Sequence, residues 1–300
     1  MRRIGLISPL AADDEEGQHR ATAFLNVLQQ LGWTEGRNVQ IVYRWGAVDA
    51  AHIRASAAEL LAAVEVIVAQ GSSITSALQQ ATRTTPVVFV NVIDPVGAGF
   101  VDSLSRPGGN ITGFTFAEYG ISGKWLELLK QIVPRMSRVA VLRDATISSG
   151  SGQLGALQSV APSLGIELTP LSVRDPNEIE RGITGFVRSS EDGLIVTGGP
   201  LAVVHRKLII AVAARHRLPA IYWSNTHVRD GGLISYGADQ IEPYREAANY
   251  VHRILKGEKP ANLPVQAASK YELVINLKTA KALLLDLPAS VLARADEVIE

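Results

Sequence analysis

Short apolar runs, rich in branched side chains, alternate with longer segments of helical periodicity along almost the whole chain. Strands that are apolar on both faces are typical of parallel sheets, which helices cover on either side. The alternation therefore predicts an α/β fold built from parallel sheets. The expected strands span residues 4–8, 39–43, 64–69, 86–91, 139–143, 166–173, 193–197 and 219–223.

The segments between these runs carry the apolar stripes of amphipathic helices. In the first of them Phe24, Leu25, Leu28 and Leu31 form one stripe, and Gly32 follows as a stop signal. The stretch 148–152 is expected to be a flexible loop because it contains little but Ser and Gly. The other expected helices span residues 50–63, 72–82, 122–133, 152–164, 177–189, 201–216, 242–256 and 277–285.

The series is interrupted near the middle of the chain. Residues 105–110 (SRPGGN) are rich in turn formers, a short apolar run follows at 111–116, and a new series starts at Val139. A single doubly wound sheet would need roughly nine or more parallel strands, which is uncommon. Two similar lobes are therefore expected.

Composition excludes several classes of protein and site. Lys plus Arg and Asp plus Glu are 29 each among 300 residues, so the formal net charge is zero and nothing indicates nucleic-acid binding. The chain has no cysteine, which excludes disulfides and thiolate sites and fits an oxidising compartment. No apolar run reaches the roughly 18 residues of a membrane span. No metal is expected, because the six histidines are scattered at positions 19, 52, 205, 216, 227 and 252.

Polar side chains follow the predicted strands, at the edge where parallel α/β sheets bind their ligands. Small hydroxyls, amides, one carboxylate per lobe and aromatic rings occur there. The candidate ligand-binding residues are Ser8, Ser72, Ser73, Asn91, Asp94, Asp144, Thr197, Trp223 and Tyr236.

Three of these candidates have side chains that could bind an amino acid or another carboxylate. Ser72 and Ser73 come where a helix begins, so two hydroxyls and unpaired N–H groups could hold an anion there. Ordinary helix capping needs only one serine and is the alternative. Asp94 could pair with an ammonium group or form an Asx turn ahead of Pro95.

The aromatic candidates lie at the end of a strand in the second series. Neighbours along a strand point to opposite faces, so Tyr222 and Trp223 cannot both face a ligand. Trp223 is nearer the tip and could stack on a planar or apolar solute. Packing under a helix is its alternative role.

No pattern of catalytic residues is evident, so the chain is not expected to be an enzyme and no cofactor is expected. Gly150, Gly152 and Gly155 match the G-x-G-x-x-G dinucleotide fingerprint, but six residues separate them from the preceding strand where a tight turn is needed. An α/β enzyme acting on a small carboxylate or a nucleotide-like substrate remains an alternative. A stand-alone ligand-sensing domain is another.

Long segments resemble a family of ABC-transporter substrate-binding proteins that includes tryptophan- and phenylalanine-binding-like members. Residues 31–39 (LGWTEGRNV) and 43–45 (YRW) are similar to the GYVEGQNV…EYRW segment of that family. The other similar segments are 86–90 (PVVFV), 94–96 (DPV), 103–113 (SLSRPGGNITG), 231–237 (GGLISYG), 254–260 (ILKGEKP), 271–282 (YELVINLKTAKA) and 292–300 (LARADEVIE). Nearly the whole chain is covered.

The resemblance implies a type I periplasmic binding fold, in which two Rossmann-like lobes are joined by three crossing strands and close on a ligand held in the cleft between them. The implied lobes are residues 1–113 plus 237–265 and residues 114–236 plus 266–300. It further implies a solute receptor of an ABC import system, monomeric and periplasmic, that delivers a small molecule to a permease in the inner membrane. The leader of such a protein would be absent from this chain.

The sequence departs from the family pattern where the ligand is expected. A usual Asn-Pro pair is replaced by residues 143–146 (RDAT), and an Ala-Asp-Pro position by residues 198–200 (GGP). The loop after the first strand reads Ser8-Pro9-Leu10 where the family has S-x-S-P-E. The scaffold is thus expected to follow the family while the pocket differs.

Overall fold

The computed structural model describes residues 1–116, 119–144, 147–189, 191–268 and 270–300. The chain forms two compact units, which are described separately below. Unit 1 comprises residues 1–117 and 240–269, and unit 2 comprises residues 118–239 and 270–300. The chain therefore passes between the units three times, and the predicted boundaries stand three to four residues earlier than these.

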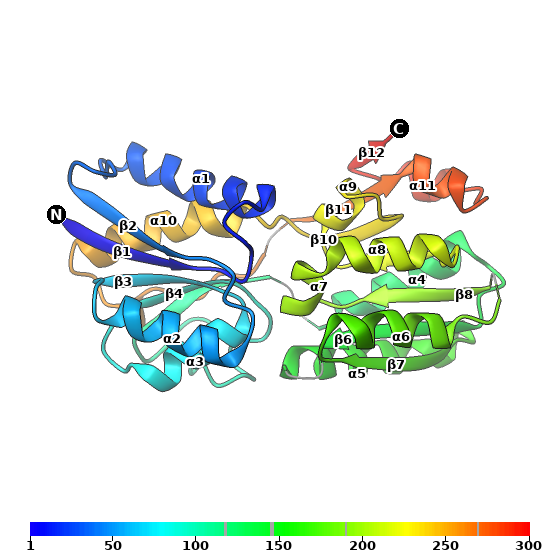
Figure 1. Cartoon of the computed structure of the whole chain (residues 1–300), viewed down its shortest axis with the longest axis horizontal. Helices are drawn as coiled ribbons and strands as arrows, with labels where there is room; N and C mark the ends of the chain where they lie inside the picture. The colour runs from blue at the N-terminus through cyan, green and yellow to red at the C-terminus, as the bar shows by residue number, and fades with distance from the viewer. Residues whose placement is uncertain (117–118, 145–146, 190, 269) are drawn as a thin grey trace. The chain divides into compact units, whose positions relative to one another are not determined.

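Unit 1 is a parallel five-stranded sheet with helices on both faces (Figure 1). The strand order is β2-β1-β3-β4-β5. Helices α1 and α10 cover one face, and α2 and α3 cover the other. The elements are β1 (Arg2–Ile7), α1 (Glu15–Gln30), β2 (Val39–Arg44), α2 (Ala50–Leu61), β3 (Val66–Gln70), α3 (Ser72–Ala81), β4 (Val87–Val92), β5 (Ile111–Thr115) and α10 (Glu242–Leu255), with a 3-10 turn η2 (Pro260–Asn262).

The alternation of side chains along β1 explains why unit 1 has two cores. Ile4 and Leu6 belong to a cluster with Phe24 of α1, whereas Ile7 belongs to a cluster with Leu60 of α2. All five side chains are essentially fully buried. A strand that is apolar on both faces is stable when both faces are buried in this way. Each such buried side chain contributes about 1.5–3 kcal/mol to the stability of the fold.

Unit 2 is a seven-stranded sheet in the order β12-β11-β10-β9-β8-β6-β7. Helices α6 and α8 pack together, and so do α4 and α5. The elements are α4 (Ile121–Ile132), β6 (Arg138–Asp144), α5 (Ser148–Val160), η1 (Ala161–Leu164), β7 (Glu167–Val173), α6 (Pro176–Phe186), β8 (Asp192–Val196), α7 (Pro200–Val204), α8 (Arg206–Arg215), β9 (Ala220–Tyr222), α9 (Asn225–Arg229), β10 (Ile234–Ala238), β11 (Tyr271–Asn276), α11 (Leu277–Ala282), α12 (Ala289–Leu292) and β12 (Glu297–Ile299).

The eight predicted strands are confirmed, each with ends within two residues of the expected ones. Two expectations were wrong. The stretch 148–152 begins helix α5 instead of forming a loop, and the single helix expected at 201–216 is two helices that meet at His205. The sheet of unit 2 is not entirely parallel, because β10 and β11 are antiparallel.

The antiparallel pair follows from the crossings. The chain leaves unit 2 just after β10 and returns just before β11, and Ala238 pairs with Tyr271. Because the chain leaves and re-enters at the same end of the sheet, β11 must run in the opposite direction to β10. The two strands beyond this point, β11 and β12, were not among those predicted.

Strand β5 leads into the first crossing and approaches β4 very closely at Gly113. This residue has φ of +152°, and a Cβ placed on it would lie 2.1 Å from the Phe89 carbonyl oxygen. Gln266 donates its N–H to the Gly113 carbonyl at 3.0 Å and accepts from the Thr115 N–H at 2.8 Å. The third crossing therefore leaves unit 1 alongside the first.

Replacing Gly113 by Ala should lower the free energy of unfolding by at least about 2 kcal/mol, because the new methyl group meets backbone that cannot move aside. Urea denaturation measures this change. Gly109→Ala is the matched control, since nothing lies within 4 Å of a Cβ at that position. Equal stability of the two variants would contradict the close approach of β4 and β5.

Candidate functional site

Each sheet has one point where the strand order reverses, and in α/β proteins ligands bind beyond the carboxyl ends of the strands at such a point. In unit 1 the reversal lies between β1 and β3, and in unit 2 it lies between β6 and β8. In unit 1, Ser8 follows β1, and residues 71–73 follow β3. In unit 2, Asp144 is the last residue of β6, and Thr197 follows β8. The fold thus brings several of the predicted site residues to the switch point of their own sheet.

Helix α3 begins at this edge of unit 1 with no side-chain cap. Its N-cap residue is Gly71, with φ of +82°, and neither Ser72 nor Ser73 makes a capping bond. The Thr75 N–H donates to the Gly71 carbonyl at 3.2 Å. Within the described ranges, the N–H groups of Ser72, Ser73 and Ile74 donate to no protein group. The capping alternative therefore does not account for the two serines, and the turn offers N–H and hydroxyl donors to an anion.

Asn91 lies beside this helix start, and its side chain has no partner in the part of the chain that the structure describes. Gln70 pairs with Val90 across β3 and β4, so Asn91 is next to Gly71. Asn91 occupies a β-bulge with φ of +56°. Its side-chain oxygen and nitrogen are both buried without a hydrogen bond. Unsatisfied buried amides are rare in native proteins, and a strained backbone together with open polar groups is a mark of a binding position.

Asp94 forms a local turn with its side chain. Its side chain accepts a hydrogen bond from the Gly97 N–H at 2.8 Å, and its φ is +47°. The bond reaches the N–H three residues on, one residue farther than in the Asx turn that was the alternative. The proposal that Asp94 binds an ammonium group has no support from this geometry.

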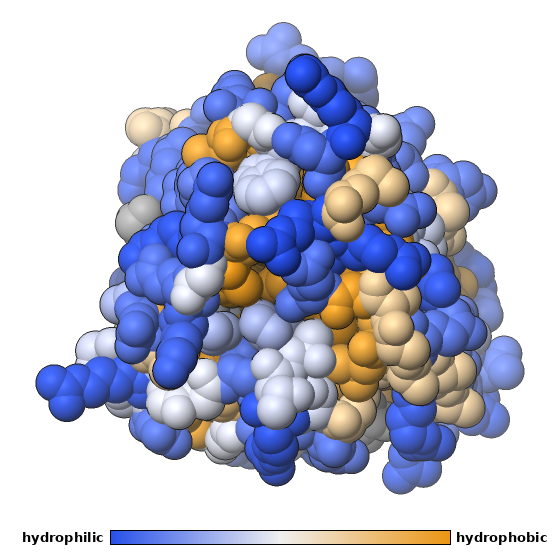
Figure 2. Space-filling model, turned by 90° about the vertical axis from the view of Figure 1, so that its left-hand side faces the viewer, coloured by the Kyte–Doolittle hydropathy of each residue, from blue (hydrophilic) through white to orange (hydrophobic). Residues whose placement is uncertain are grey.

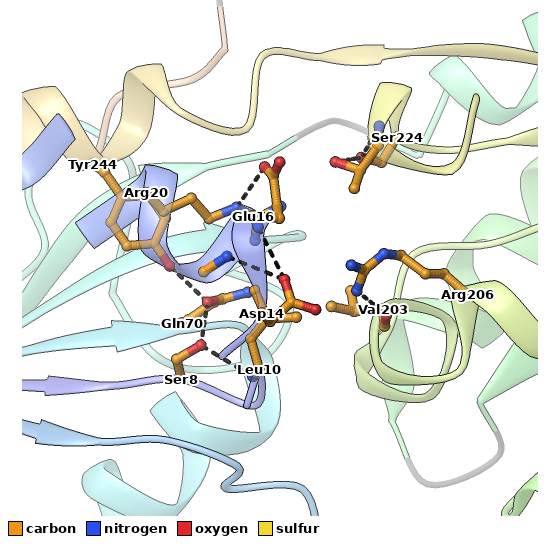
Figure 3. A network of polar contacts seen from close by, with 12 residues as sticks. Ser8, Leu10, Asp14, Glu16, Arg20, Gln70, Val203, Arg206, Ser224 and Tyr244 are labelled. Atoms are coloured by element: carbon orange, nitrogen blue, oxygen red, sulfur yellow. Dashed lines mark hydrogen bonds and ion pairs between the residues drawn. The ribbon is translucent and has the colours of Figure 1, made fainter. Parts of the chain in front are cut away.

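Ser8 is fully buried and serves the site indirectly. Its hydroxyl donates to Gln70 Oε1 at 2.8 Å and accepts from the Leu10 N–H at 3.1 Å. Tyr244 of α10 donates to the same Gln70 oxygen at 2.7 Å (Figure 3). Sequence reasoning did not name Gln70 or Tyr244 as site residues. The available signal was a lone polar residue at the end of the otherwise apolar strand β3.

The acidic residues 13–16 span the start of α1 and are partly structural. Asp14 caps the helix by accepting from the N–H groups of Glu16 and Gly17. Glu16 pairs at 3.0 Å with Arg20, whose side chain is 3 % exposed. Burial raises the pKa of the nearby Tyr244 phenol, while the positive charge of Arg20 opposes that rise.

In unit 2 the predicted residues are more tightly enclosed. Thr197 donates its hydroxyl to the Leu142 carbonyl at 2.9 Å, so this hydroxyl is used within the protein. Asp144 is buried at the end of β6 and lies against Gly199. The cavity that these residues line measures about 10 Å³, which is room for a single water at most. Residues 145 and 146, which continue this loop, lie outside the described residues.

Two aromatic residues of unit 2, Tyr222 and Trp223, pack against the buried His227 ring. The His227 ring stacks on Tyr222 at 5.0 Å and meets Trp223 edge-on at 6.2 Å. Trp223 is only 5 % exposed, as expected of a packed residue. Tyr236 is half-buried, and its ring pairs with Tyr271 at 6.0 Å. Of the two aromatic residues predicted to contact the ligand, Trp223 and Tyr236, Tyr236 has the more exposed side chain.

The dinucleotide fingerprint does not form a phosphate-binding turn. Gly150, Gly152 and Gly155 all lie inside helix α5, and none has a positive φ. Among the described residues there is no group of three or more His, Asp or Glu side chains placed to hold a metal ion. No helix in the described ranges combines the length and apolarity of a membrane span.

A hollow of about 280 Å³ lies on the far edge of unit 1, where its strands begin (Figure 2). Ile254 and Leu255 contribute apolar surface to it, and Arg2 and Glu65 at its rim pair with each other. This edge is opposite to the one that carries Ser72 and Asn91. The hollow therefore plays no part in the candidate site.

Comparison with known proteins assigns the family. The profile of the ABC transporter substrate-binding proteins matches residues 13–299. The chain belongs to this family. Membership implies a small-molecule ligand and an ABC permease as partner, and proteins of this family typically act outside the cytoplasm. The predicted type I periplasmic binding fold, with two α/β lobes, is confirmed by the structural comparisons.

Individual members of the ABC substrate-binding family are similar over nearly the full chain. A tyrosine-binding protein from Clostridioides difficile (strain R20291) is 26 % identical over 261 residues, which cover 87 % of this chain and 75 % of that protein. The crystal structure of a conserved domain protein from Vibrio cholerae O1 biovar El Tor is 25 % identical, with a TM-score of 0.89 and 99 % of both chains covered. A domain from Streptococcus pneumoniae in complex with L-Trp has the same TM-score and coverage at 24 % identity.

The buried His227 should make the stability of this receptor depend on pH. Burial lowers the pKa of His227 from 6.5 to about 4, so the unfolded chain binds the proton more readily. The contribution of His227 is fully present above pH 6.5 and is lost as the pH falls toward 4. Its size is about 3 kcal/mol, at 1.36 kcal/mol for each pKa unit.

Urea denaturation between pH 7 and pH 4 tests this dependence. His227→Gln should flatten the decline of unfolding free energy by about 3 kcal/mol relative to the wild type. His19→Gln, at an exposed position, is the control and should follow the wild-type curve. Parallel curves for all three proteins would show that His227 is not held neutral by burial.

Proposed function

We propose that this protein is the solute receptor of an ABC import system and that it binds an amino acid through its carboxylate. The observation that carries the proposal is the start of α3, where two serine hydroxyls and three N–H groups have no partner among the described residues, beside the unsatisfied amide of Asn91. A carboxylate satisfies such a group of donors and is favoured by the positive end of the helix dipole.

The open donors at the start of α3 and at Asn91 are neutral. Arg20 is paired with Glu16 and Arg44 with Glu59, so these cations are already balanced. Neutral donors suit a singly charged carboxylate, whereas phosphate sites commonly recruit Arg or Lys. The unsatisfied Asn91 oxygen adds an acceptor, which an amino group of the same solute can satisfy.

An aromatic amino acid is the solute class we propose. One similar protein is named for binding tyrosine, and another was crystallised with L-Trp. Of the predicted ring contacts, the half-buried Tyr236 is placed on β10 and Trp223 follows β9. A stacking contact would add about 0.5–1.5 kcal/mol beyond area burial.

The protein would act by binding alone, without turnover, as a periplasmic monomer that delivers its solute to a permease of the inner membrane. Family membership supports the ligand and the permease. The periplasmic location, the monomeric state and the closure of two lobes on the ligand stay predictions.

A thermal-shift experiment tests the proposed solute class. L-Trp or L-Tyr at 100 times its Kd should stabilise the wild-type protein by about 2.7 kcal/mol. Ser72→Ala/Ser73→Ala should lose about 1–3 kcal/mol of binding free energy, because hydrogen bonds to a charged group are removed. The unliganded melting temperature should stay within about 1 °C, since neither hydroxyl caps α3 or bonds to another group in the described part of the chain.

The control for this pair is Ser159→Ala/Ser163→Ala, which removes two exposed hydroxyls that bond only to nearby carbonyls. It should bind like the wild type. If the Ser72/Ser73 variant binds with full affinity, the anion site lies elsewhere. If no amino acid stabilises the wild type, the proposed solute class is wrong.

A further inference from the structure

Gln70 ends strand β3 at the switch point of unit 1, and its side chain is held from two sides. It is 6 % exposed. Its Oε1 accepts from the Ser8 hydroxyl at 2.8 Å and from the Tyr244 phenol at 2.7 Å. These donors come from β1 and α10, so three separate segments meet at one oxygen atom (Figure 3).

The hydrogen-bond partners of the two hydroxyls determine which end of the Gln70 amide faces them. Each hydroxyl has a single proton to donate. The Ser8 oxygen already accepts from the Leu10 N–H, so its proton goes to Gln70. Among the described residues, the group besides Gln70 that hydrogen-bonds the Tyr244 phenol is the Arg20 guanidinium, which is only a donor, while Glu16 acts on the phenol through its charge alone.

The reversed amide would leave both hydroxyl protons without an acceptor in a buried place, which proteins avoid. Oxygen must therefore face the network, and nitrogen must face away from it. Burial raises the pKa of the Tyr244 phenol, so the phenol keeps its proton and the orientation does not change near neutral pH.

The Gln70 amide nitrogen donates to no group in the part of the chain that the structure describes. It lies directly before Gly71 and the uncapped turn of α3. We infer that Gln70 determines specificity by donating its two N–H groups to an acceptor oxygen of the solute, and that Ser8 and Tyr244 are positioning residues that fix this orientation. The inference deepens the proposed function and rests on it for the identity of the acceptor as a carboxylate.

Held in this orientation, Gln70 selects solute groups that accept hydrogen bonds over groups that donate them. A carboxylate oxygen accepts from the Gln70 amide, whereas an ammonium group brings only donors and leaves the amide protons unpaired. Gln70 therefore discriminates an amino acid from the corresponding amine. A charge would not be needed for this discrimination, because an amide locked in one orientation presents donors only.

Gln70→Glu replaces the outward donor by an acceptor of nearly the same shape. Isothermal titration should show at least a 30-fold loss of affinity for L-Trp and no loss for tryptamine, which has no carboxylate. Gln80→Glu is the matched control, since it makes the same change at an exposed position of α3 and should bind L-Trp like the wild type. Unchanged L-Trp affinity of Gln70→Glu, or an equal loss for L-Trp and tryptamine, would overturn the inference.

Tyr244→Phe tests the positioning role without introducing a charge. Loss of the phenol proton lets the Gln70 amide rotate. L-Trp affinity should then fall about 3- to 10-fold, which corresponds to the strength of one hydrogen bond. Tryptamine affinity should stay constant. This variant keeps the buried ring and decides the question if Gln70→Glu does not fold. Equal effects on both probes would show a purely structural role for Tyr244.

A measurement without any ligand separates this inference from the proposed function. The side-chain amide protons of Gln70, assigned by their absence from the NMR spectrum of Gln70→Met, should exchange rapidly with water in the free protein. Protection of these protons in the free protein would show that the nitrogen faces the buried network and would overturn the inference. If wild type binds neither L-Trp nor L-Tyr, the proposed solute class fails and the exchange rate alone decides the role of Gln70.

Discussion

Parallel pairing of strands is the constraint on which the rest of this structure depends. Each crossover between parallel strands returns the chain to the beginning of the next strand, so the segments that follow the parallel strands emerge at the same edge of their sheet. At the switch point the neighbouring crossovers run to opposite faces of the sheet, and in α/β proteins ligands bind at such a point. Ser8 and Gln70, which are 62 positions apart, become hydrogen-bond partners there because β1 and β3 are adjacent.

The three crossings add a second constraint. Because α10 belongs to unit 1 although it follows β10 of unit 2, its Tyr244 reaches an oxygen on β3 that is 174 positions earlier. The same path forces β11 to run against β10. The site of unit 1 is thus completed by a helix that the chain adds only after most of unit 2 has been built, so the site depends on both halves of the sequence.

Local pattern was enough to predict the strands, because a strand buried on both faces must be apolar throughout, as β3 is. It was also enough to place Ser72, Ser73 and Asn91 near the carboxyl ends of two strands, where a ligand is expected. It did not predict that the hydroxyls of Ser8 and Thr197 form hydrogen bonds within the protein. Nor did it predict that Tyr244 hydrogen-bonds the Gln70 side chain. Those facts depend on which distant segment lies opposite, and no local periodicity encodes that. The Ser- and Gly-rich start of α5 was misjudged because packing overrode weak helix propensity.

Hydrogen-bond satisfaction separates scaffold from site among these residues. Ser8, Thr197 and Asp94 have their side chains paired within the protein, and they support turns, strands and other side chains. The start of α3 and the Asn91 amide are left open although they are buried or half-buried, which is costly unless a ligand completes them. The α3 turn lacks acceptors, whereas Asn91 lacks both an acceptor and a donor. A solute that brings a carboxylate and an ammonium group on neighbouring atoms meets both needs at once, and this pairing is the chemistry of an α-amino acid.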